Sequence, residues 1–313
     1  MREIQIEKND RGQRLDKFLQ KYLPEASKGF LYKMLRKKNI KLNGARANGN
    51  EILKCDDRIT IYFSEETFLK FRGGSGQRQY PVTNLDLIYE DENLLIINKP
   101  VGMLSQKAHR EDISLVEYLL GYLQAGGKWK PGGAFTPGIC NRLDRNTSGL
   151  VLAGKSLAGL QEMARILKDR SLNKYYYTIV EGQILQPAKI EGYLSKEESE
   201  NRVRIYDEPA DGRSLIQTSY EPIATGRDVT FLRVKLITGK THQIRSHLGS
   251  IGHPVMGDVK YGAERQSGLH HFLLHAGEIE FPELRPPLSE LSNQKFEADL
   301  PKEFQRWKKK LLN

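Results

Sequence analysis

The sequence has few cysteines and no long apolar run, and both absences narrow the class of protein. Its 313 residues include only two cysteines, Cys55 and Cys140, which are too far apart in the chain to indicate a disulfide framework. No segment approaches the roughly 18 uninterrupted apolar residues that a membrane-spanning helix needs. The first residues are polar and alternating, without the apolar core of a secretory signal. We therefore expect a cytoplasmic protein with no membrane partner.

The sequence also lacks the short motifs that usually identify cofactor and metal sites. It contains neither a Walker-type phosphate loop nor a glycine-rich dinucleotide fingerprint. Six of its 7 histidines lie between His242 and His275, but their spacing matches no metal signature and no cysteine accompanies them. We therefore expect no cofactor and no metal.

Positive charge is abundant and unevenly distributed. Residues 1–80 hold 18 of the 49 Lys and Arg residues but only 10 of the 39 Asp and Glu residues, so most of the net charge of +10 lies there. A concentrated positive field favours a polyanion, because phosphate contacts release bound counterions. A solvated basic face without any partner has the same composition, and charge alone does not decide between the two.

Length and hydrophobic patterning predict two domains of unequal size joined by a linker. Residues 12–64 combine two amphipathic helices with short strands. Residues 65–84 include the polar, glycine-rich run RGGSGQR and are predicted to be a flexible linker. Residues 85–313 contain more strand-like apolar runs than helical patterns, and the two do not alternate strictly. This order predicts a mixed α+β fold rather than a doubly wound sheet.

The boundaries of the expected elements follow from the period of the apolar residues. Pro24 ends the first helix, and an Asn43-Gly44 turn closes the first strand. The predicted helices cover Leu15–Leu23, Lys28–Lys38, Leu115–Leu123 and Leu157–Leu167, and the predicted strands cover 40–42, 59–63, 94–97, 150–153, 175–180 and 231–237.

The stretch most informative about chemistry is 141–149, with the letters NRLDRNTSG. It reads as a loop between two strand-like segments, and it places Asp144 between two arginines. Nearby cations favour the ionised carboxylate, which is the form that a nucleophile needs. Taken alone, however, the pattern favours a structural role for Asp144, in an Asp–Arg ion pair that stabilises a turn. A catalytic role is the less favoured interpretation of the residues alone.

The same stretch resembles the signature of the RluA-type pseudouridine synthases, with RLD at 142–144 followed by TSG at 147–149. In that family the aspartate of this motif is catalytic, which implies the same role for Asp144. Asn141 departs from the pattern, since many relatives have histidine there. The resemblance implies an isomerase that acts on uridine in RNA, with a catalytic domain built on a mixed, mainly antiparallel β-sheet.

Two further segments resemble the family's other motifs, in the family's order. The segment 98–103, NKPVGM, resembles the block after the first strand of the catalytic domain. Gln106 follows it, where a histidine is often found. The segment 174–182, KYYYTIVEG, resembles the lysine-x-tyrosine motif and implies that Tyr176 is the active-site tyrosine.

A third block, LITGKTHQIRSH at 236–247, continues the resemblance, and GHPVMGDVKYG at 252–262 follows it. By analogy with the family, Arg245 pairs with the catalytic aspartate. His242 lies at an expected turn from strand to helix, where it would orient a loop or contact RNA.

The N-terminal module resembles the S4-like RNA-binding domain, with RLDKFL at 14–19, a basic second helix and KLNG at 41–44. In such domains two helices present basic side chains to structured RNA. A small basic module that binds protein, or nothing, stays open as an alternative. The residues expected to bind RNA or position the substrate are Lys33, Arg36, Lys37, Lys99, Arg142, Lys174 and His242.

The resemblance implies that a single carboxylate, that of Asp144, carries out the reaction by one of two routes. Asp144 would either attack C1′ of the target ribose or assist glycosidic cleavage by removing a proton from C2′. Tyr176 would stack on the uracil, and its hydroxyl would assist proton transfer at C5. We expect the substrate to be large-subunit (23S) ribosomal RNA and the enzyme to be a monomer.

Other functions remain open at this level. The chain could modify transfer RNA, or it could be a non-catalytic RNA-binding factor in ribosome assembly. A carboxylate-based glycoside hydrolase is disfavoured, because such enzymes usually use two carboxylates and only one stands out here.

Overall fold

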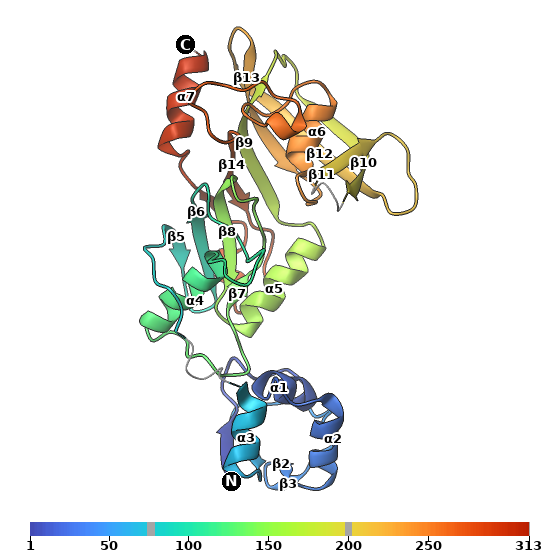
Figure 1. Cartoon of the computed structure of the whole chain (residues 1–313), viewed down its shortest axis with the longest axis vertical. Coiled ribbons are helices and arrows are strands. Elements are labelled where there is room, and N and C mark those ends of the chain that lie inside the picture. The colour runs from blue at the N-terminus through green and yellow to red at the C-terminus, as the bar shows by residue number, and fades with distance from the viewer. Residues whose placement is uncertain (74–78, 198–201, 313) are drawn as a thin grey trace. The chain divides into compact units, whose positions relative to one another are not determined.

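The computed structural model describes residues 1–73, 79–197 and 202–312 (Figure 1). Within these ranges no helix combines the length and hydropathy that crossing a bilayer requires. The chain divides into two compact units. The first comprises Met1–Asn84, Val116–Gly138 and Gly154–Leu160, and the second comprises Leu85–Leu115, Ile139–Ala153 and Gln161–Asn313.

The first unit contains a four-stranded antiparallel sheet with the strand order β1-β4-β2-β3. Helices α1 and α2 and strands β2 and β4 lie where the period of the apolar residues predicted them. Its N-terminal elements are β1 (Arg2–Gln5), α1 (Leu15–Tyr22), α2 (Lys28–Arg36), β2 (Ile40–Leu42), β3 (Ala45–Arg46), β4 (Arg58–Ile61) and α3 (Glu65–Arg72).

Local backbone chemistry sets the ends of these elements. The Ser27 hydroxyl caps α2 by accepting a hydrogen bond from the Phe30 amide at 3.2 Å. The helix ends at Arg36, two residues before the predicted end, and Lys38 has a φ of 59° that no helix continues through. Asn43 and Gly44 both have positive φ, which makes the tight turn between β2 and β3.

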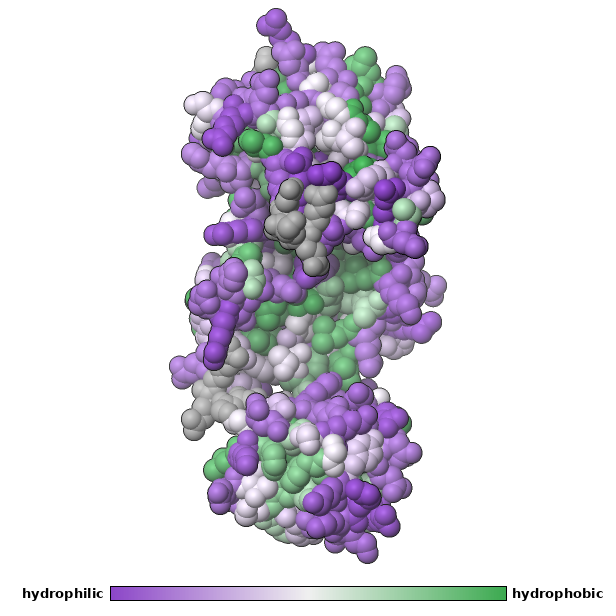
Figure 2. All heavy atoms as spheres, turned by 45° about the vertical axis from the view of Figure 1, so that its right-hand side comes forward, coloured by the Kyte–Doolittle hydropathy of each residue, from purple (hydrophilic) through white to green (hydrophobic). Residues whose placement is uncertain are grey.

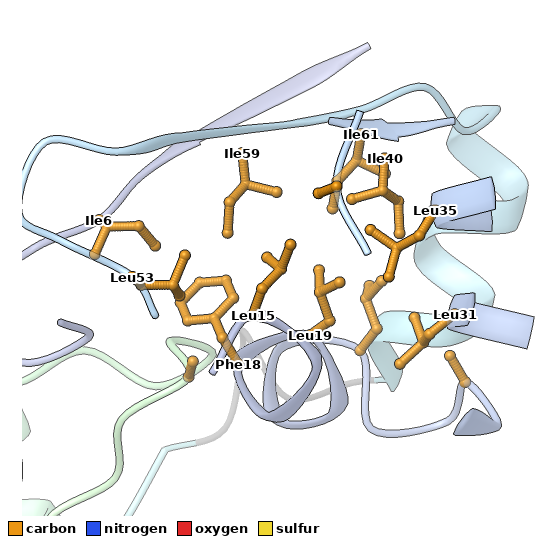
Figure 3. Close-up of a cluster of buried hydrophobic side chains, with 14 of the residues drawn as sticks. Ile6, Leu15, Phe18, Leu19, Leu31, Leu35, Ile40, Leu53, Ile59 and Ile61 are labelled. Carbon is orange, nitrogen blue, oxygen red and sulfur yellow. The ribbon is translucent and has the colours of Figure 1, made fainter. Parts of the chain in front are cut away.

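One hydrophobic core holds the first unit together (Figure 3). Side chains from α1 and α2 meet side chains from β2 and β4 there, and each large apolar side chain that is buried contributes roughly 1.5–3 kcal/mol. The residues labelled in the close-up are Ile6, Leu15, Phe18, Leu19, Leu31, Leu35, Ile40, Leu53, Ile59 and Ile61.

The predicted linker over 65–84 is wrong at its start, because Glu65–Arg72 form helix α3. The Ser64 hydroxyl caps this helix, and Phe68 is only 2% exposed, within the core of the first unit. The segment has a low mean hydropathy and only one buried face, so its sequence did not indicate a packed helix. The rest of the glycine-rich run, residues 74–78, lies outside the described residues.

The second unit contains most of an 11-stranded sheet, which runs β11-β10-β12-β13-β9-β14-β8-β6-β5 with β15 beside β14 and β7 beside β8. The β14–β8 pair is parallel, whereas β9, β10, β12 and β13 pair with their neighbours in antiparallel fashion. The expectation of a mixed α+β fold with a mainly antiparallel sheet is therefore confirmed.

The elements from residue 85 onward follow in chain order, and α4 and α5 each have residues in both units. Their bounds are β5 (Leu87–Glu90), β6 (Leu94–Lys99), α4 (Leu115–Ala125), β7 (Gly138–Ile139), β8 (Ser148–Gly154), α5 (Leu157–Lys168), β9 (Asn173–Glu181), β10 (Ala188–Glu197), β11 (Arg202–Tyr206), β12 (Ser214–Thr225), β13 (Val229–Leu236), α6 (Gln243–Ser250), η2 (Val259–Tyr261), β14 (Leu274–Glu280), η3 (Ser289–Leu291), β15 (Lys295–Glu297) and α7 (Lys302–Leu312).

A core in the second unit fixes the strands that carry the site. Leu150 and Leu152 of β8 share a buried cluster with Ile96 of β6 and with Met163 and Ile166 of α5. Hydrophilic residues predominate on the face shown in Figure 2, in keeping with a chain that is 28% charged. Strand β8 is thus held on a rigid base.

Buried His275 adds a polar tie between β14 and β8. Its Nε2 lies 3.0 Å from the Ala298 carbonyl oxygen, which only accepts hydrogen bonds, so Nε2 carries the proton. Its Nδ1 then accepts from the Ser148 hydroxyl at 2.8 Å. Burial lowers the pKa of His275 and also that of His247, whose ring contacts the Thr218 hydroxyl. Folding therefore favours the neutral form of both rings.

We expect stability to fall as the pH drops below about 6.5, the pKa of histidine in an unfolded chain. The unfolded state then binds protons that folded His275 and His247 do not, at up to about 1.4 kcal/mol per pH unit for each group. Urea unfolding of His275→Gln between pH 7 and 5 should show a shallower decline than the parent. His270→Gln, at an exposed position, is the matched control. Equal slopes for parent and His275→Gln would contradict the assignment.

Candidate active site

The site is built on the loop between β7 and β8, which carries Asp144. The Thr147 amide donates to the Asp144 carbonyl oxygen at 3.1 Å and closes the turn. The buried Ser105 hydroxyl accepts from the Leu143 amide at 3.0 Å and donates to the Leu143 carbonyl at 2.7 Å. The backbone beside Asp144 is therefore fixed from both sides.

Two residues of the motif join this loop to the sheet. Gly149 has a φ of 112°, and a Cβ there would lie 2.2 Å from the Ala276 carbonyl oxygen, so only glycine fits. The Asn141 side chain accepts from the Leu152 amide at 2.8 Å and donates to the Leu150 carbonyl at 3.3 Å. Asn141, which replaces the family's histidine, thus extends the pairing of β8.

Lys99 does not contact solvent, which corrects our expectation that it binds RNA. Its side chain is 0% exposed, and its ammonium donates to the carbonyl oxygens of Pro100, Met103 and Arg145 at 2.9, 2.8 and 3.2 Å. Burial lowers the pKa of Lys99 to about 8, and the negative charge of Asp144 opposes this shift. Lys99 therefore holds the backbone next to Asp144 and has no route to a ligand.

We expect Lys99→Met to lower the free energy of unfolding by about 3 kcal/mol, because three carbonyl groups lose a charged donor inside the protein. Urea unfolding measures this loss. Lys107→Met, on the same loop region but partly exposed, is the control for loss of a lysine. A change below about 0.5 kcal/mol, typical of surface substitutions, would show that the buried ammonium does not hold the loop.

Asp144 forms an ion pair with Arg245, the partner that the family resemblance implied. The Nη1 atom of Arg245 donates to Oδ2 of Asp144 at 2.9 Å. The same guanidinium binds Asp258 through two hydrogen bonds, from Nε at 2.6 Å and from Nη2 at 2.9 Å. Its carbon lies 4.0 Å from the centre of the Phe272 ring. The guanidinium plane is therefore locked, and one nitrogen remains to orient Asp144.

The two carboxylates on Arg245 differ in exposure. The Asp258 side chain is 2% exposed, whereas that of Asp144 is 27% exposed. Among the described residues, no group donates a hydrogen bond to Oδ1 of Asp144. Asp258 is thus the structural partner of the arginine, and Asp144 is the carboxylate that a ligand can reach.

His242 lies at the turn before α6, where the sequence placed it. It adopts a left-handed backbone conformation with a φ of 54°. Its Nδ1 lies 2.8 Å from the Tyr261 hydroxyl, and its Nε2 lies 3.8 Å from Oδ2 of Asp144. Burial lowers the pKa of His242, against the raising effect of the Asp144 charge. The ring therefore borders the carboxylate without forming a close ion pair with it.

Strand β9 contributes Tyr176 and Lys174 to the site. Side chains alternate across a strand, so these two share one face, and Tyr175 and Tyr177 lie on the other. Tyr176 is almost completely buried, and burial together with the charge of Asp144 raises its pKa. Its hydroxyl is therefore protonated at neutral pH.

These side chains line one pocket of about 680 Å³ within the second unit. Among the predicted residues, those that line it are Arg142, Asp144, Lys174, Tyr176, His242 and Arg245. Gln106 and Asn141 also border it. A partly exposed carboxylate beside a protonated phenol and several cations suits nucleophilic or proton-transfer chemistry on an anionic ligand.

The other predicted residues lie elsewhere. Lys33 and Arg36 on α2 and Lys37 directly after it are exposed in the first unit and are not part of the pocket. In the described part of the chain, no group of His, Cys, Asp and Glu side chains is arranged to hold a metal ion.

Sequence reasoning did not assign a role to Asp258 or Tyr261, although both fell within a recognised block. Asp258 is 13 residues from Arg245 in the chain, and no local pattern links the two. The one available signal is an acidic residue among the apolar and glycine residues of GHPVMGDV. Such a residue needs a buried partner.

Known proteins resemble this chain in sequence and in fold. A family model described as RNA pseudouridylate synthase matches residues 93–250. Ribosomal large subunit pseudouridine synthase D of Zymomonas mobilis is 33% identical over 73% of this chain and 73% of its own. Ribosomal large subunit pseudouridine synthase C of Vibrio parahaemolyticus is 29% identical over 89% of this chain and 87% of its own. The solved structure of human RNA pseudouridylate synthase domain containing 4 covers 70% of this chain and 90% of its own, with 18% identity and a TM-score of 0.57.

Proposed function

This chain belongs to the RNA pseudouridylate synthase family, and from that premise we propose that its substrate is large-subunit (23S) ribosomal RNA. Family membership makes it an isomerase that converts uridine to pseudouridine in RNA. The names of the two bacterial relatives refer to the ribosomal large subunit, which supports the choice of RNA.

We propose that Asp144 is the catalytic residue, that Arg245 orients it and that Tyr176 contacts the uracil. The observation that carries this proposal is the 2.9 Å bond between Arg245 and the partly exposed Asp144 carboxylate, in a pocket that Tyr176 also lines. A preoriented charge is effective because it needs no reorganisation during the reaction.

The reaction conserves all atoms of the nucleotide. The bond between ribose C1′ and uracil N1 breaks, the base rotates, a bond from C1′ to C5 forms, and the C5 proton is released while N1 gains a proton. Extruding the uridine from its stack costs a few kcal/mol. Asp144 either attacks C1′ or removes the C2′ proton, and its unbonded Oδ1 is available for both routes. In this proposal the Tyr176 hydroxyl, which belongs to the same pocket lining, assists proton transfer at C5.

The remaining predicted residues have binding roles in this proposal. Arg142 and His242, which line the pocket, contact the substrate nucleotide. The N-terminal segment 12–64 acts as an S4-like domain and docks RNA through the exposed cations Lys33, Arg36 and Lys37. The larger domain, from residue 85 onward, carries out the chemistry. The whole chain acts as a monomer. Neither Cys55 nor Cys140 forms a disulfide, which supports a cytoplasmic setting.

Pseudouridine mapping of total RNA from cells with and without the protein tests this function. We expect one or a few sites in 23S ribosomal RNA to lose pseudouridine. If pseudouridine were lost only from transfer RNA, the substrate would be transfer RNA and not 23S ribosomal RNA. Unchanged RNA, with no tritium released from C5-labelled transcripts by the purified protein, would favour a non-catalytic assembly factor.

A further inference from the structure

Lys174 is a partly buried cation that no acidic group of the described residues neutralises. Burial lowers the pKa of Lys174, and the neighbouring positive charge of Arg170 lowers it further. Among the described residues, no atom accepts a hydrogen bond from the ammonium. A partly buried cation without an acidic partner is less favourable than one in water, and an anionic ligand in the pocket would compensate its charge.

Among the other cations that line the same pocket, Arg170 and Lys240 come from different segments. Arg170 follows the end of α5 with a φ of 56°, a left-handed conformation that ends the helix. Lys240 lies in the segment after β13, next to Gly239. A Cβ on Gly239 would lie 3.8 Å from Nζ of Lys174, so the ammonium lies close to this segment. Arg170 from the turn after α5, Lys174 from β9 and Lys240 from the β13–α6 connection therefore border one pocket.

The position of Lys174 relative to the reaction centre is fixed by the strand. Lys174 and Tyr176 are two residues apart on the same face of β9, which corresponds to about 7 Å along the strand. That separation is comparable to the one between a uracil and the phosphate beside its own ribose. A ligand with its base at Tyr176 thus brings a phosphate to the Lys174 end of the pocket.

We propose that Lys174, Arg170 and Lys240 form a subsite for the phosphodiester group that flanks the extruded uridine. This inference rests on the proposed function, because it takes RNA as the ligand. Arginine offers a bidentate fork and lysine a point charge, and together they match a tetrahedral phosphate. Lys174 is thus a binding residue whose charge is neutralised only in the complex.

The first test is the salt dependence of binding to an unmodified transcript of large-subunit ribosomal RNA. Loss of one phosphate contact should reduce the slope of log K against log salt by about 0.7–0.9. We expect this reduction for Lys174→Gln, together with affinity about fivefold to tenfold weaker at physiological salt. Lys174→Arg should keep the slope. Lys168→Gln removes an exposed cation of α5 that does not line the pocket, and should leave slope and affinity unchanged.

The second test uses the protein without RNA. Since Lys174 is an uncompensated cation, Lys174→Gln should raise the thermal unfolding midpoint, which also shows that the variant folds. Inorganic phosphate should raise the midpoint of the parent more than that of Lys174→Gln. The proposed subsite would be contradicted if Lys174→Gln had a lower unfolding midpoint than the parent. It would also be contradicted if phosphate raised the midpoints of both proteins equally.

The outcomes separate this subsite from the proposed function. An unchanged slope for Lys174→Gln, with turnover lost at saturating RNA, would overturn the subsite and place Lys174 in the chemistry. A reduced slope supports the subsite whether or not the transcript becomes modified. A parent enzyme that forms no pseudouridine would count against the proposed function alone.

Discussion

Asp144→Asn is expected to reduce pseudouridine formation by on the order of 10⁴-fold or more, while RNA affinity stays within about twofold. Asparagine keeps the shape of the side chain and can still accept a hydrogen bond from Arg245. It has no negative charge, so it neither attacks C1′ nor removes a proton from C2′. Arg245 keeps both hydrogen bonds to Asp258, and the fold around the site is preserved. Tritium release from C5-labelled transcript under single-turnover conditions measures the loss.

Two controls accompany this variant. The thermal unfolding midpoint should match that of the parent, because the Asp144 side chain is partly exposed and the buried Asp258–Arg245 pair is intact. Asp144→Glu retains the charge but moves it by about one bond length, and a displacement near 1 Å costs roughly 10²-fold in rate. If Asp144→Asn released tritium at the parental rate, another group would have to perform the chemistry.

The elements that sequence patterns predicted share a continuous apolar run or a regular helical stripe. Strand β8 is buried along its whole length, and α5 has apolar residues at helical spacing. Strands β10, β11 and β12 were not predicted. Along β12, buried positions alternate with half-exposed or exposed ones, and charged or polar residues interrupt every apolar run. Cross-strand pairing, which a sequence does not display, makes these segments strands.

Some residues of the site could likewise be predicted from the sequence, and others could not. The family motifs identified Asp144 and Arg245, which are 101 positions apart and meet only in the folded chain. The residues alone favoured an ion pair that holds a turn, and the structure contains such a pair, with the carboxylate left partly exposed. Lys99 was assigned to RNA because it is a lysine in a motif. Its carbonyl partners include Arg145, 46 positions away, so its burial could not be read from local sequence.

Arg245→Met is expected to reduce both activity and stability. The activity loss should be about 10²–10³-fold, the usual consequence of removing one preorganised donor. The free energy of unfolding should fall by about 3–5 kcal/mol, because Asp258 would be left as a buried carboxylate without its partner. Single-turnover kinetics at saturating RNA and urea unfolding measure the two effects separately. The single variant alone cannot assign the activity loss to catalysis, since a loosened site is also less active.

The double variant Arg245→Met, Asp258→Asn resolves this ambiguity. Removing both charges leaves no unpaired ion in the interior, so most of the lost stability should return. Activity should stay low, because no guanidinium orients the Asp144 carboxylate. Asp258→Asn alone keeps the contact between Arg245 and Asp144, and it should retain more activity than either variant that lacks the arginine. Recovery of activity together with stability in the double variant would reduce Arg245 to a structural residue.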